Sequence, residues 1–468
     1  MLFIKWLYGF FLNALLVLGV ACADEDNRAD LLTVYQQAMA NDAQLSAARH
    51  EYLALREVAP QAKAGLLPTL SAGGSLESIR MTMDEPNLTR TRSHSVFQAN
   101  LNQPLFRLDR WYQLEAAHAS AAQAELEFRG KEQAMVLGVA HVYLETLRML
   151  DSLAASKAEE AALKRQQEQA EGRLANGASS MTDVLDAKAV YDTAHANRKL
   201  AERKVDDAFE ALTRLTNHEY SSIEGIEHHL PIEAPLPNNA KRWVTQALQQ
   251  NLSLLASNFA VEAAEKTRHQ HKAGFAPTLD AVASYRQGDN DSFGYSNPVS
   301  GYHGDVAQRS IGLQLNIPLY SGGMTRSQVR EATQRLAQRE DQRDDRRREV
   351  VETTRNLYRA INSDVEQVAA RRQSIISSQS SLKATVKGRA LGSRNTMDVL
   401  NAERQLYRAV REYNNARYDY VLNTLNLKQA AGVLNLADLT ALTQYMNKEY
   451  DPDRDFLPPD SRHLSWPG

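Results

Sequence analysis

Residues 310–318 read SIGLQLNIP, and this stretch decides the fold. Apolar and polar side chains alternate along it, so a strand here has one apolar face and one polar face. The apolar positions are Ile311, Leu313, Leu315 and Ile317, and the polar ones are Gly312, Gln314 and Asn316. Such a strand suits a barrel wall between lipid and water. It also suits a small soluble sheet, and the alternation alone leaves both interpretations open.

Three other segments share this character, which gives expected strands at about 69–80, 93–103, 278–287 and 307–318. In the second, Phe97, Ala99 and Leu101 alternate with Gln98, Asn100 and Asn102. The two others alternate less cleanly. In the third, Leu279, Ala281, Ala283 and Tyr285 fit the lipid face, with Asp280, Ser284 and Arg286 opposite. The polar segments 81–92 and 288–307 are the expected loops, because Gly, Asn, Asp and Pro favour turns.

Three sequence patterns occur twice, in the same order and 209 to 215 residues apart. They are AGLLPTL at 64–70 with AGFAPTL at 273–279, NQPLF at 102–106 with NIPLY at 316–320, and TDVLDA at 182–187 with MDVLNA at 397–402. Three ordered matches indicate a tandem duplication, so each half is expected to contribute one pair of strands and the helices that follow it.

Long helices are expected around the strands. Proline is absent from 105–230 and from 319–451, and both tracts are rich in Ala, Leu, Gln, Glu and Arg. Apolar residues recur there at steps of three and four, as in a coiled-coil seam. The two seams are Val136, Ala140, Tyr143, Leu147, Leu150 and Ala154, and then Val350, Thr354, Leu357, Ile361, Val365 and Val368. The unbroken pattern over 110–175 corresponds to roughly 100 Å of helix at 1.5 Å per residue.

The number of strands restricts how the chain can cross a membrane. Four strands cannot close a barrel, and an open sheet edge is not tolerated in lipid. Two chains would supply eight strands and an interior filled by side chains, whereas three chains supply twelve and leave a lumen. A trimer is therefore the smallest assembly that makes a pore.

The amino terminus has the pattern of an export signal. Lys5 precedes the apolar run 6–20, and Ala21-Cys22-Ala23 forms a cleavage site before an acidic segment. The alternative is that Cys22 is retained and acylated, although Gly19 stands where such sites usually have leucine. No later stretch reaches the ~18 apolar residues of a spanning helix, so any membrane crossing must use strands.

Composition excludes several classes of function. The 54 basic and 57 acidic residues give a formal charge of −3, without the basic excess of a nucleic-acid binder. Cys22 is the one cysteine, which excludes thiol catalysis and cysteine zinc clusters in the mature chain. The histidines 228–229 and 269–271 lack a zinc-site pattern, and 289–291 lacks the ligands of a calcium loop. We find no phosphate loop or nucleophile elbow, and expect no enzyme activity, no cofactor and no metal site.

The chain resembles the TolC family of outer-membrane exit ducts over roughly residues 30–440. The resemblance is densest in DVLNA at 398–402, ARYDY at 416–420, LNLK at 425–428 and GVLN at 432–435, and it includes SGGM at 321–324. It implies a mainly α protein with a β-barrel portion: a homotrimer whose four strands per chain form a twelve-stranded barrel in outer-membrane lipid, above a periplasmic tunnel of helices. It also implies two partners, a periplasmic adaptor protein and an inner-membrane transporter of the RND, ABC or MFS type.

The duplication and the resemblance together divide the chain. The expected parts are a signal peptide at 1–23, a first repeat at 24–217, a connecting segment of an equatorial belt at 218–242, a second repeat at 243–432, and a further belt segment with a tail at 433–468. The tail is expected to be disordered from Asp451 onward, because it is polar and contains Pro458-Pro459.

In this family, rings of acidic side chains form the constriction at the periplasmic end. Asp398 matches the first ring position, and Asn401 stands at the second, one helical turn further on. The resemblance thus implies a single negative collar of three Asp398 side chains, which favours cations and could bind a divalent ion. The alternative is that Asp183 and Asp398 only cap helices that start after Gly177 and Gly392.

The resemblance also implies a latch that holds the constriction closed. Arg394 matches the family's arginine, and Thr182 and Asp183 match its partners in the other half. Arg389 occupies the position of a tyrosine, so a second ion pair with Asp183 would replace a phenol hydrogen bond. Partly exposed ion pairs contribute about 0–1 kcal/mol each, little enough for a docking partner to reverse.

The predicted function is a gated, trimeric exit duct in the outer membrane of a Gram-negative bacterium, serving a multidrug efflux pump or a type I protein secretion system. The absence of nucleotide-binding motifs means that another protein must supply the energy for transport. The alternative is a periplasmic coiled-coil scaffold without a pore, which would be recovered as soluble material.

Overall fold

The computed structural model describes residues 28–85, 88–289 and 304–459. The predicted signal peptide lies outside the described residues, as do most of the expected loop at 288–307 and the last residues of the tail. The helices are α1 (Leu31–Asn41), α2 (Ala43–Arg56), α3 (Val58–Ala64), α4 (Leu108–Ala175), α5 (Met181–Thr216), α6 (Ala240–Gln250), α7 (Leu252–Ala273), α8 (Met324–Ala390), α9 (Thr396–Ala430), α10 (Leu436–Thr443) and α11 (Pro452–Asp455). The strands are β1 (Arg28–Ala29), β2 (Thr69–Met83), β3 (Leu88–Phe106), β4 (Ser222–Ile223), β5 (Gly225–Ile226), β6 (Thr278–Asp289), β7 (Asp305–Asn316) and β8 (Met446–Asn447).

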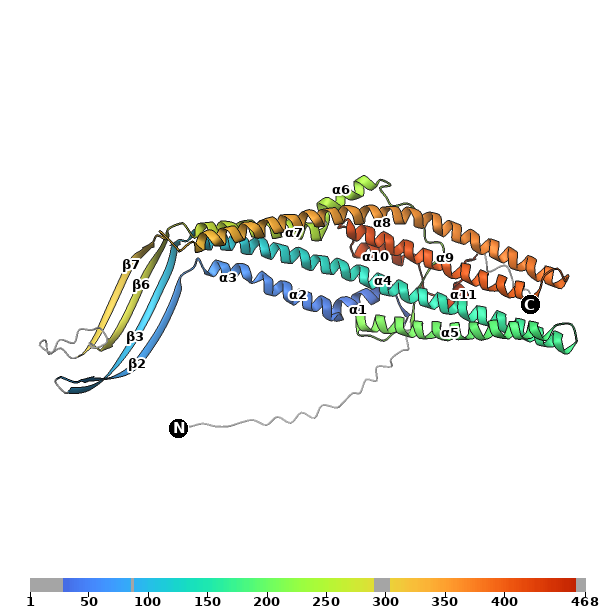
Figure 1. Cartoon of the computed structure of the whole chain (residues 1–468), viewed down its shortest axis with the longest axis horizontal. Helices are drawn as coiled ribbons and strands as arrows, with labels where there is room; N and C mark the ends of the chain where they lie inside the picture. Colours follow the sequence, from blue (N-terminus) through green and yellow to red (C-terminus); the bar gives the residue numbers. More distant parts are fainter. Residues whose placement is uncertain (1–27, 86–87, 290–303, 460–468) are drawn as a thin grey trace, which may run out of the picture.

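The molecule is elongated, with a sheet at one end and two helical hairpins reaching to the other (Figure 1). The 68-residue α4 spans about 100 Å at 1.5 Å per residue. It leads from the sheet to a turn and returns as α5, and α8 and α9 repeat this course on the other side of the molecule. The same order of elements, two strands, a long helix, a turn and a shorter helix, therefore occurs twice, as the repeated sequence patterns predict.

The four long strands form one antiparallel sheet in the order β2-β3-β6-β7. Pairing sets Leu70 opposite Leu101, Leu101 opposite Ala283 and Ala283 opposite Ile311. Directly paired residues lie on the same face of a sheet, so the apolar positions of all four strands share one face. Phe97 and Tyr285 meet edge to face on it, with their ring centroids 6.4 Å apart. The predicted division into an apolar and a polar face is confirmed.

The strands are displaced from the expected bounds. β2 runs to Met83 and β3 starts at Leu88, so the first loop is much shorter than the expected 81–92. Met81, Met83 and Leu88 extend the strands to this turn, whereas the sequence pattern places these positions in the loop. β3 also continues to Phe106, beyond a ladder irregularity between Pro104 and Phe106. Proline has no N–H to donate to the ladder, which accounts for the irregularity there.

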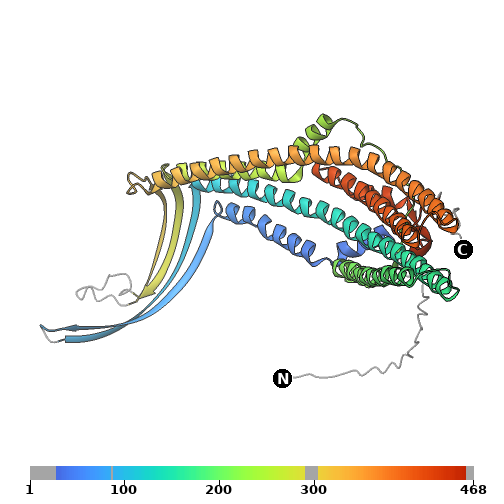
Figure 2. The same ribbon diagram turned by 45° about the vertical axis from the view of Figure 1, so that its right-hand side comes forward.

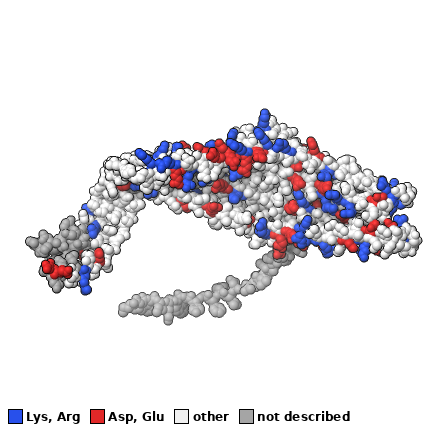
Figure 3. Space-filling view, in the orientation of Figure 1, with Lys and Arg blue, Asp and Glu red and all other residues white. Residues whose placement is uncertain are grey.

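The sheet is curved and leaves the helices at a steep angle (Figure 2). In the face that Figure 3 shows, Lys, Arg, Asp and Glu are spread over the helices, whereas the strands are nearly free of them between the helices and the strand tips. Apolar side chains are instead exposed along the sheet, and Leu76 and Ile311 each retain about nine-tenths of their accessible surface, 89% and 91%. A single chain thus has an apolar surface at the end that carries the sheet.

The helical seams follow the predicted periodicity. In α4, Val136, Ala140, Tyr143, Leu147 and Ala154 are buried. In α8 the buried seam residues are Val350, Thr354, Ile361 and Val368. α4 packs against α5, α7 and α9, and α8 packs against α7 and α9. No helix among the described residues combines the length and the apolar character needed to cross a membrane.

The short elements of the expected belt, at 218–242 and 433–459, lie beside the middle of the long helices, where the largest buried apolar cluster is found. β1 pairs with β4, and β5 pairs with β8. The phenol groups of Tyr418 and Tyr450 donate to the buried Asp151 carboxylate at 2.7 and 2.6 Å. Burial raises the pKa of Asp151 to about 6, and these two hydrogen bonds oppose the rise. The carboxylate thereby joins α4, α9 and the belt.

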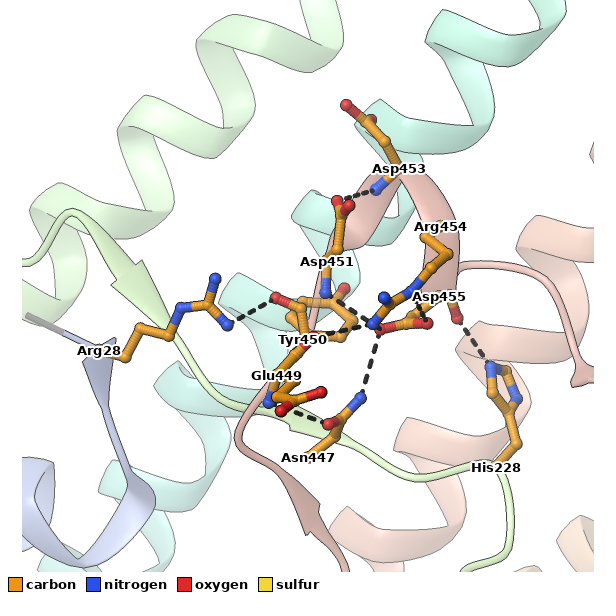
Figure 4. Close-up of polar contacts among 9 residues, drawn as sticks. All are labelled: Arg28, His228, Asn447, Glu449, Tyr450, Asp451, Asp453, Arg454 and Asp455. Carbon is orange, nitrogen blue, oxygen red and sulfur yellow. Dashed lines mark hydrogen bonds and ion pairs between the residues drawn. The ribbon is translucent and has the colours of Figure 1, made fainter. Parts of the chain in front are cut away.

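The prediction that the tail is disordered from Asp451 is wrong as far as residue 459. Asp451 caps α11, and the Asp455 carboxylate accepts hydrogen bonds from Asn447 and Arg454 (Figure 4). Phe456 is buried in the cluster between α4, α8 and α9, and its carbonyl accepts from Asn414 at 2.9 Å. A few long-range contacts therefore order a segment whose own composition is polar.

Candidate functional site

The two hairpin turns lie together at the end of the molecule opposite the sheet (Figure 1). Each helix before a turn ends at a glycine in the left-handed region, Gly177 with φ 68° and Gly392 with φ 75°. The next N–H closes the end of the helix, from Ala178 to the Arg173 carbonyl and from Ser393 to the Gly388 carbonyl. Glycine is needed here because a side chain disfavours this backbone region.

Each helix after a turn starts with a reciprocal cap. The Ser180 hydroxyl accepts the N–H of Asp183 at 3.1 Å, and the Asp183 carboxylate accepts the N–H of Ser180 at 3.1 Å. Asn395 and Asp398 repeat this arrangement at 2.8 and 3.1 Å. Both aspartates therefore cap helices, as the alternative to the collar in the sequence analysis proposes. Capping does not prevent a carboxylate from also lining a constriction.

The capping contacts have an electrostatic consequence at Asp183. The N–H of Ser180 and the hydroxyl groups of Ser179 and Ser180 hold the pKa of this carboxyl below its usual value. Asp398, one helical turn from the exposed Asn401, is half-buried. Thr182 and Arg394 are exposed beside the turns. The structure thus brings all six predicted site residues to the same end of the chain.

Within one chain, the predicted latch residue Arg389 has partners other than Asp183. The Arg389 guanidinium, on α8, donates to the side-chain oxygens of Gln166 at 2.6 Å and Gln169 at 3.2 Å, both on α4. Across residues 28–85, 88–289 and 304–459, no ion pair joins Arg389 or Arg394 to Asp183. A latch between these charges therefore requires a neighbouring copy, and it stays a prediction.

Two buried polar residues near the turns have no counterpart among the predicted site residues. The Gln166 amide donates to the Glu403 carboxylate at 3.2 Å, which connects α4 to α9. Burial raises the pKa of Glu403 to about 7. One feature of the sequence indicates that Glu403 is buried, because it stands three residues before Leu406 on the apolar face of the helix. The sequence does not show that another helix covers this face.

Two of the histidines considered as zinc ligands in the sequence analysis make other contacts. His269 stacks on Tyr112 with the ring centroids 5.2 Å apart, and His228 donates to the Asp455 carbonyl at 2.8 Å (Figure 4). In the part of the chain that the structure describes, no three histidine, cysteine or acidic side chains are grouped as metal ligands.

Comparison of the sequence with known families and proteins gives three results. The family model described as "Outer membrane efflux protein" matches residues 34–218 and 243–433. The outer membrane protein TolC of Escherichia coli (strain K12) is 31% identical over 439 residues, which cover 92% of this chain and 88% of that protein. The alkaline protease secretion protein AprF of Pseudomonas aeruginosa is 29% identical over 442 residues, covering 93% and 89%.

Among solved structures, CusC, described in terms of conformational changes that accompany folding and transmembrane channel formation, superposes with a TM-score of 0.75 at 18% identity. The superposition covers 86% of this chain and 92% of CusC. At this level of identity the similarity shows that the two chains share a fold. The elongated arrangement of sheet and helical hairpins is therefore common to both proteins.

Proposed function

The chain belongs to the outer membrane efflux protein family, and we propose that three copies of it form a continuous duct through the outer membrane and across the periplasm. One observation carries the proposal: the sheet β2-β3-β6-β7 has two edge strands, β2 and β7, and an apolar face that is exposed in a single chain. In lipid an unpaired strand edge is unfavourable, because its N–H and C=O groups find no water.

Barrel closure by several copies satisfies both strand edges. β2 of one copy would pair with β7 of the next, and four strands from each of three copies would give twelve. The strands have 12 to 19 residues, more than the roughly 9–11 that a tilted strand needs to cross a bilayer. The apolar face formed by Leu101, Ala283 and Ile311 would then contact lipid, and the polar face would line the lumen.

The long helices would continue the duct below the membrane. α4 and α8 reach about 100 Å from the sheet, a length that suits a tunnel through the periplasm. The segments 218–242 and 433–459 would form the belt around it. At the far end the hairpin turns would close the tunnel and would meet a periplasmic adaptor and an inner-membrane transporter, which supplies the energy.

The comparisons suggest two classes of cargo for the proposed duct. AprF is named for the secretion of alkaline protease and the matching family model is described as an efflux protein, so a secreted polypeptide and a small exported molecule are the two candidates. Deleting the gene and measuring sensitivity to a panel of toxic compounds, together with the secreted proteins in the medium, separates efflux from secretion.

Cell fractionation tests the proposal against the scaffold alternative. We expect the protein in the outer-membrane fraction as a trimer that dissociates when heated in detergent. A coiled-coil scaffold without a pore would instead be recovered from the periplasm without detergent, and that result would refute the proposed duct.

The collar is tested by removing the charge of Asp398. We expect Asp398→Ala to lower the cation selectivity of single channels in planar bilayers, because three carboxylates leave the constriction. The alanine also removes the cap with Asn395. Asp398→Asn is the matched control, because it removes the charge while its amide oxygen can still accept the Asn395 N–H, and it should lose selectivity as well. Loss of selectivity in the alanine variant alone would assign the effect to the cap and remove the collar.

The latch is tested at Arg394, whose side chain is exposed and would pair with Asp183 of a neighbouring copy in the proposed trimer. We expect Arg394→Ser to raise the open probability of the channel, since it removes up to about 1 kcal/mol at each of three contacts. Arg394→Lys should retain most of the closed state because it keeps the charge. Equal currents for the wild type and the serine variant would rule out the latch.

A further inference from the structure

The interface between α4 and α9 is crossed by a ladder of polar contacts. Each rung joins one α4 side chain to one α9 side chain, and the order of the rungs is antiparallel. The rungs are Arg148 with Asp419 at 2.6 Å, Asp151 with Tyr418 at 2.7 Å, Glu159 with Arg411 at 2.9 Å, and Gln166 with Glu403 at 3.2 Å. From Asp151 onward they recur every seven or eight residues on both helices, the spacing of a coiled-coil seam.

Small residues fill the same seam between the rungs. Ala154, Ala155 and Ala162 of α4 are buried there, and Ala409 faces them from α9. Separating two helices costs about 25 cal/mol for each Å² of apolar surface that becomes exposed, so an alanine seam is easier to open than a leucine seam. On the α9 side Leu400, Leu406 and Val410 are also buried, so the interface between the two hairpins combines apolar contacts with its polar rungs.

The last rung before the turns pairs a buried carboxylate with a neutral amide. Glu403 retains 6% of its accessible surface, and its Oε1 atom accepts from Gln166. The second oxygen, Oε2, is buried without a hydrogen-bond donor among the described residues. The Gln166 oxygen in turn accepts from Arg389, so one amide connects α8, α4 and α9. Gln166 is a positioning residue, because it holds Glu403 and Arg389 in place.

The surroundings of Glu403 favour its neutral form. The charged groups around it are Arg165 and Glu159 on α4 and Arg389 on α8, and Tyr407 follows it on α9. Burial, the largest effect, opposes ionisation, as does Glu159, whereas the Gln166 hydrogen bond and the two arginines favour it. The pKa is raised to about 7, so the packed conformation binds a proton that a solvent-exposed glutamate would have lost.

The sign of the pH effect follows from this difference. Protonation of Glu403 stabilises the packed state relative to a state in which α9 has moved away and the carboxyl group meets water. This stabilisation is fully present below the ordinary glutamate pKa and is lost as the pH rises through about 7, where the buried carboxyl ionises. Alkaline conditions should therefore loosen the end of the α4–α9 ladder.

We propose that Gln166, Glu403 and Arg389 form a proton-responsive clamp that holds the α8–α9 hairpin on the α4–α5 hairpin and releases it when Glu403 ionises. The clamp lies within one chain. It includes Arg389, which the resemblance assigns to the latch, but neither Arg394 nor Asp183. Its role in gating rests on the proposed function, because only a duct has an end that must open. The chemical signal that it reads is the proton concentration of the compartment around the hairpin turns.

The clamp is tested by measuring single-channel currents between about pH 5.5 and 8.5, a range that brackets the raised pKa of Glu403. All variants carry Asp398→Asn, so that the collar contributes no titration. We expect the open probability to rise severalfold with pH across neutrality, and Glu403→Gln to abolish the rise and keep the channel closed. Glu168→Gln, which removes an exposed carboxylate two residues from Gln166, should retain the rise. A rise that persists in Glu403→Gln, or no rise in the parent, would refute the clamp.

Hydrogen exchange separates failure of the clamp from failure of the duct. In the full-length protein, exchange of the amides at 396–410, corrected for its intrinsic pH dependence, should quicken through neutral pH in the parent but not in Glu403→Gln. If no variant conducts, the proposed duct is wrong and exchange alone decides on the clamp. If the channels conduct but exchange of this segment is the same in both proteins, the clamp is wrong and the duct stands.

Discussion

Ile311→Arg will prevent assembly of the protein in the outer membrane, and Gln314→Arg will not. Ile311 lies near the middle of β7 with 91% of its surface exposed, on the same face as Ala283 and Leu101. An arginine on the lipid face of a barrel costs about 2–4 kcal/mol at the bilayer midplane, and a trimer carries three of them. Gln314 pairs with Asp280 on the opposite face, where an arginine would meet water.

The measurement is the amount of heat-modifiable trimer in the outer-membrane fraction at equal expression. We expect at least about a tenfold loss for Ile311→Arg, because each 1.4 kcal/mol changes an equilibrium tenfold. Gln314→Arg should assemble as the wild type does. If both variants assembled equally well, the apolar face would not contact lipid, and the sheet would be a soluble one.

Gly432→Ala will destabilise the junction of α9 with the belt far more than the same change at other left-handed glycines. Gly432 has φ 74° and follows the end of α9, where the N–H of Val433 closes the helix on the Lys428 carbonyl. A Cβ atom at Gly432 would lie 2.1 Å from the Gln250 carbonyl oxygen, at the junction of α6 and α7. The backbone there is fixed, because Asn251 caps α7 and donates to the Ala430 carbonyl at 2.9 Å.

Gly392→Ala is the matched control, because Gly392 has φ 75° and no atom within 4 Å of the added Cβ. It isolates the backbone cost of a left-handed alanine, about 1 kcal/mol. For Gly432→Ala we expect a loss of at least about 3 kcal/mol, seen as a lower melting temperature and faster proteolysis near residues 432–445. Equal losses in the two variants would mean that the contact between α9 and the α6–α7 junction does not contribute to stability.

The sheet and the hairpins were predictable because their signals are local. Alternation at Ile311, Leu313 and Leu315 follows directly from the two-residue period of a strand, and it needs no knowledge of distant segments. The left-handed glycines and the reciprocal caps likewise occupy a few consecutive residues around each turn. The sequence spacing S-x-x-D at Ser180 and N-x-x-D at Asn395 contains the whole capping arrangement.

The ordered tail and the clamp were not predictable in the same way, because long-range contacts create them. Phe456 and Leu457 are two apolar residues in an acidic segment, and the packing of Phe456 against α9 helps to order the tail. Gln166 and Glu403 are 237 residues apart in the chain, and neither stands in a recognisable motif. The ladder becomes visible only when the antiparallel register of α4 and α9 is known.

Cross-linking of the sheet edges tests the central claim, that identical copies complete one barrel wall. In a chain whose single cysteine, Cys22, is replaced by alanine, Leu313→Cys on β7 would be combined in turn with Leu70→Cys, Ala72→Cys and Leu76→Cys on β2. Within one chain β2 and β7 are three strand spacings apart, about 14 Å, whereas a disulfide requires Cα atoms within about 7 Å.

Oxidation of the membrane fraction should therefore link different copies. The account predicts that at least one pair gives covalent dimers and trimers on denaturing gels, with no larger species, and that none of the single-cysteine variants gives a trimer. A chain that reaches the outer membrane but forms no cross-link with any pair, or one whose ladder continues beyond three copies, would contradict a closed trimeric wall.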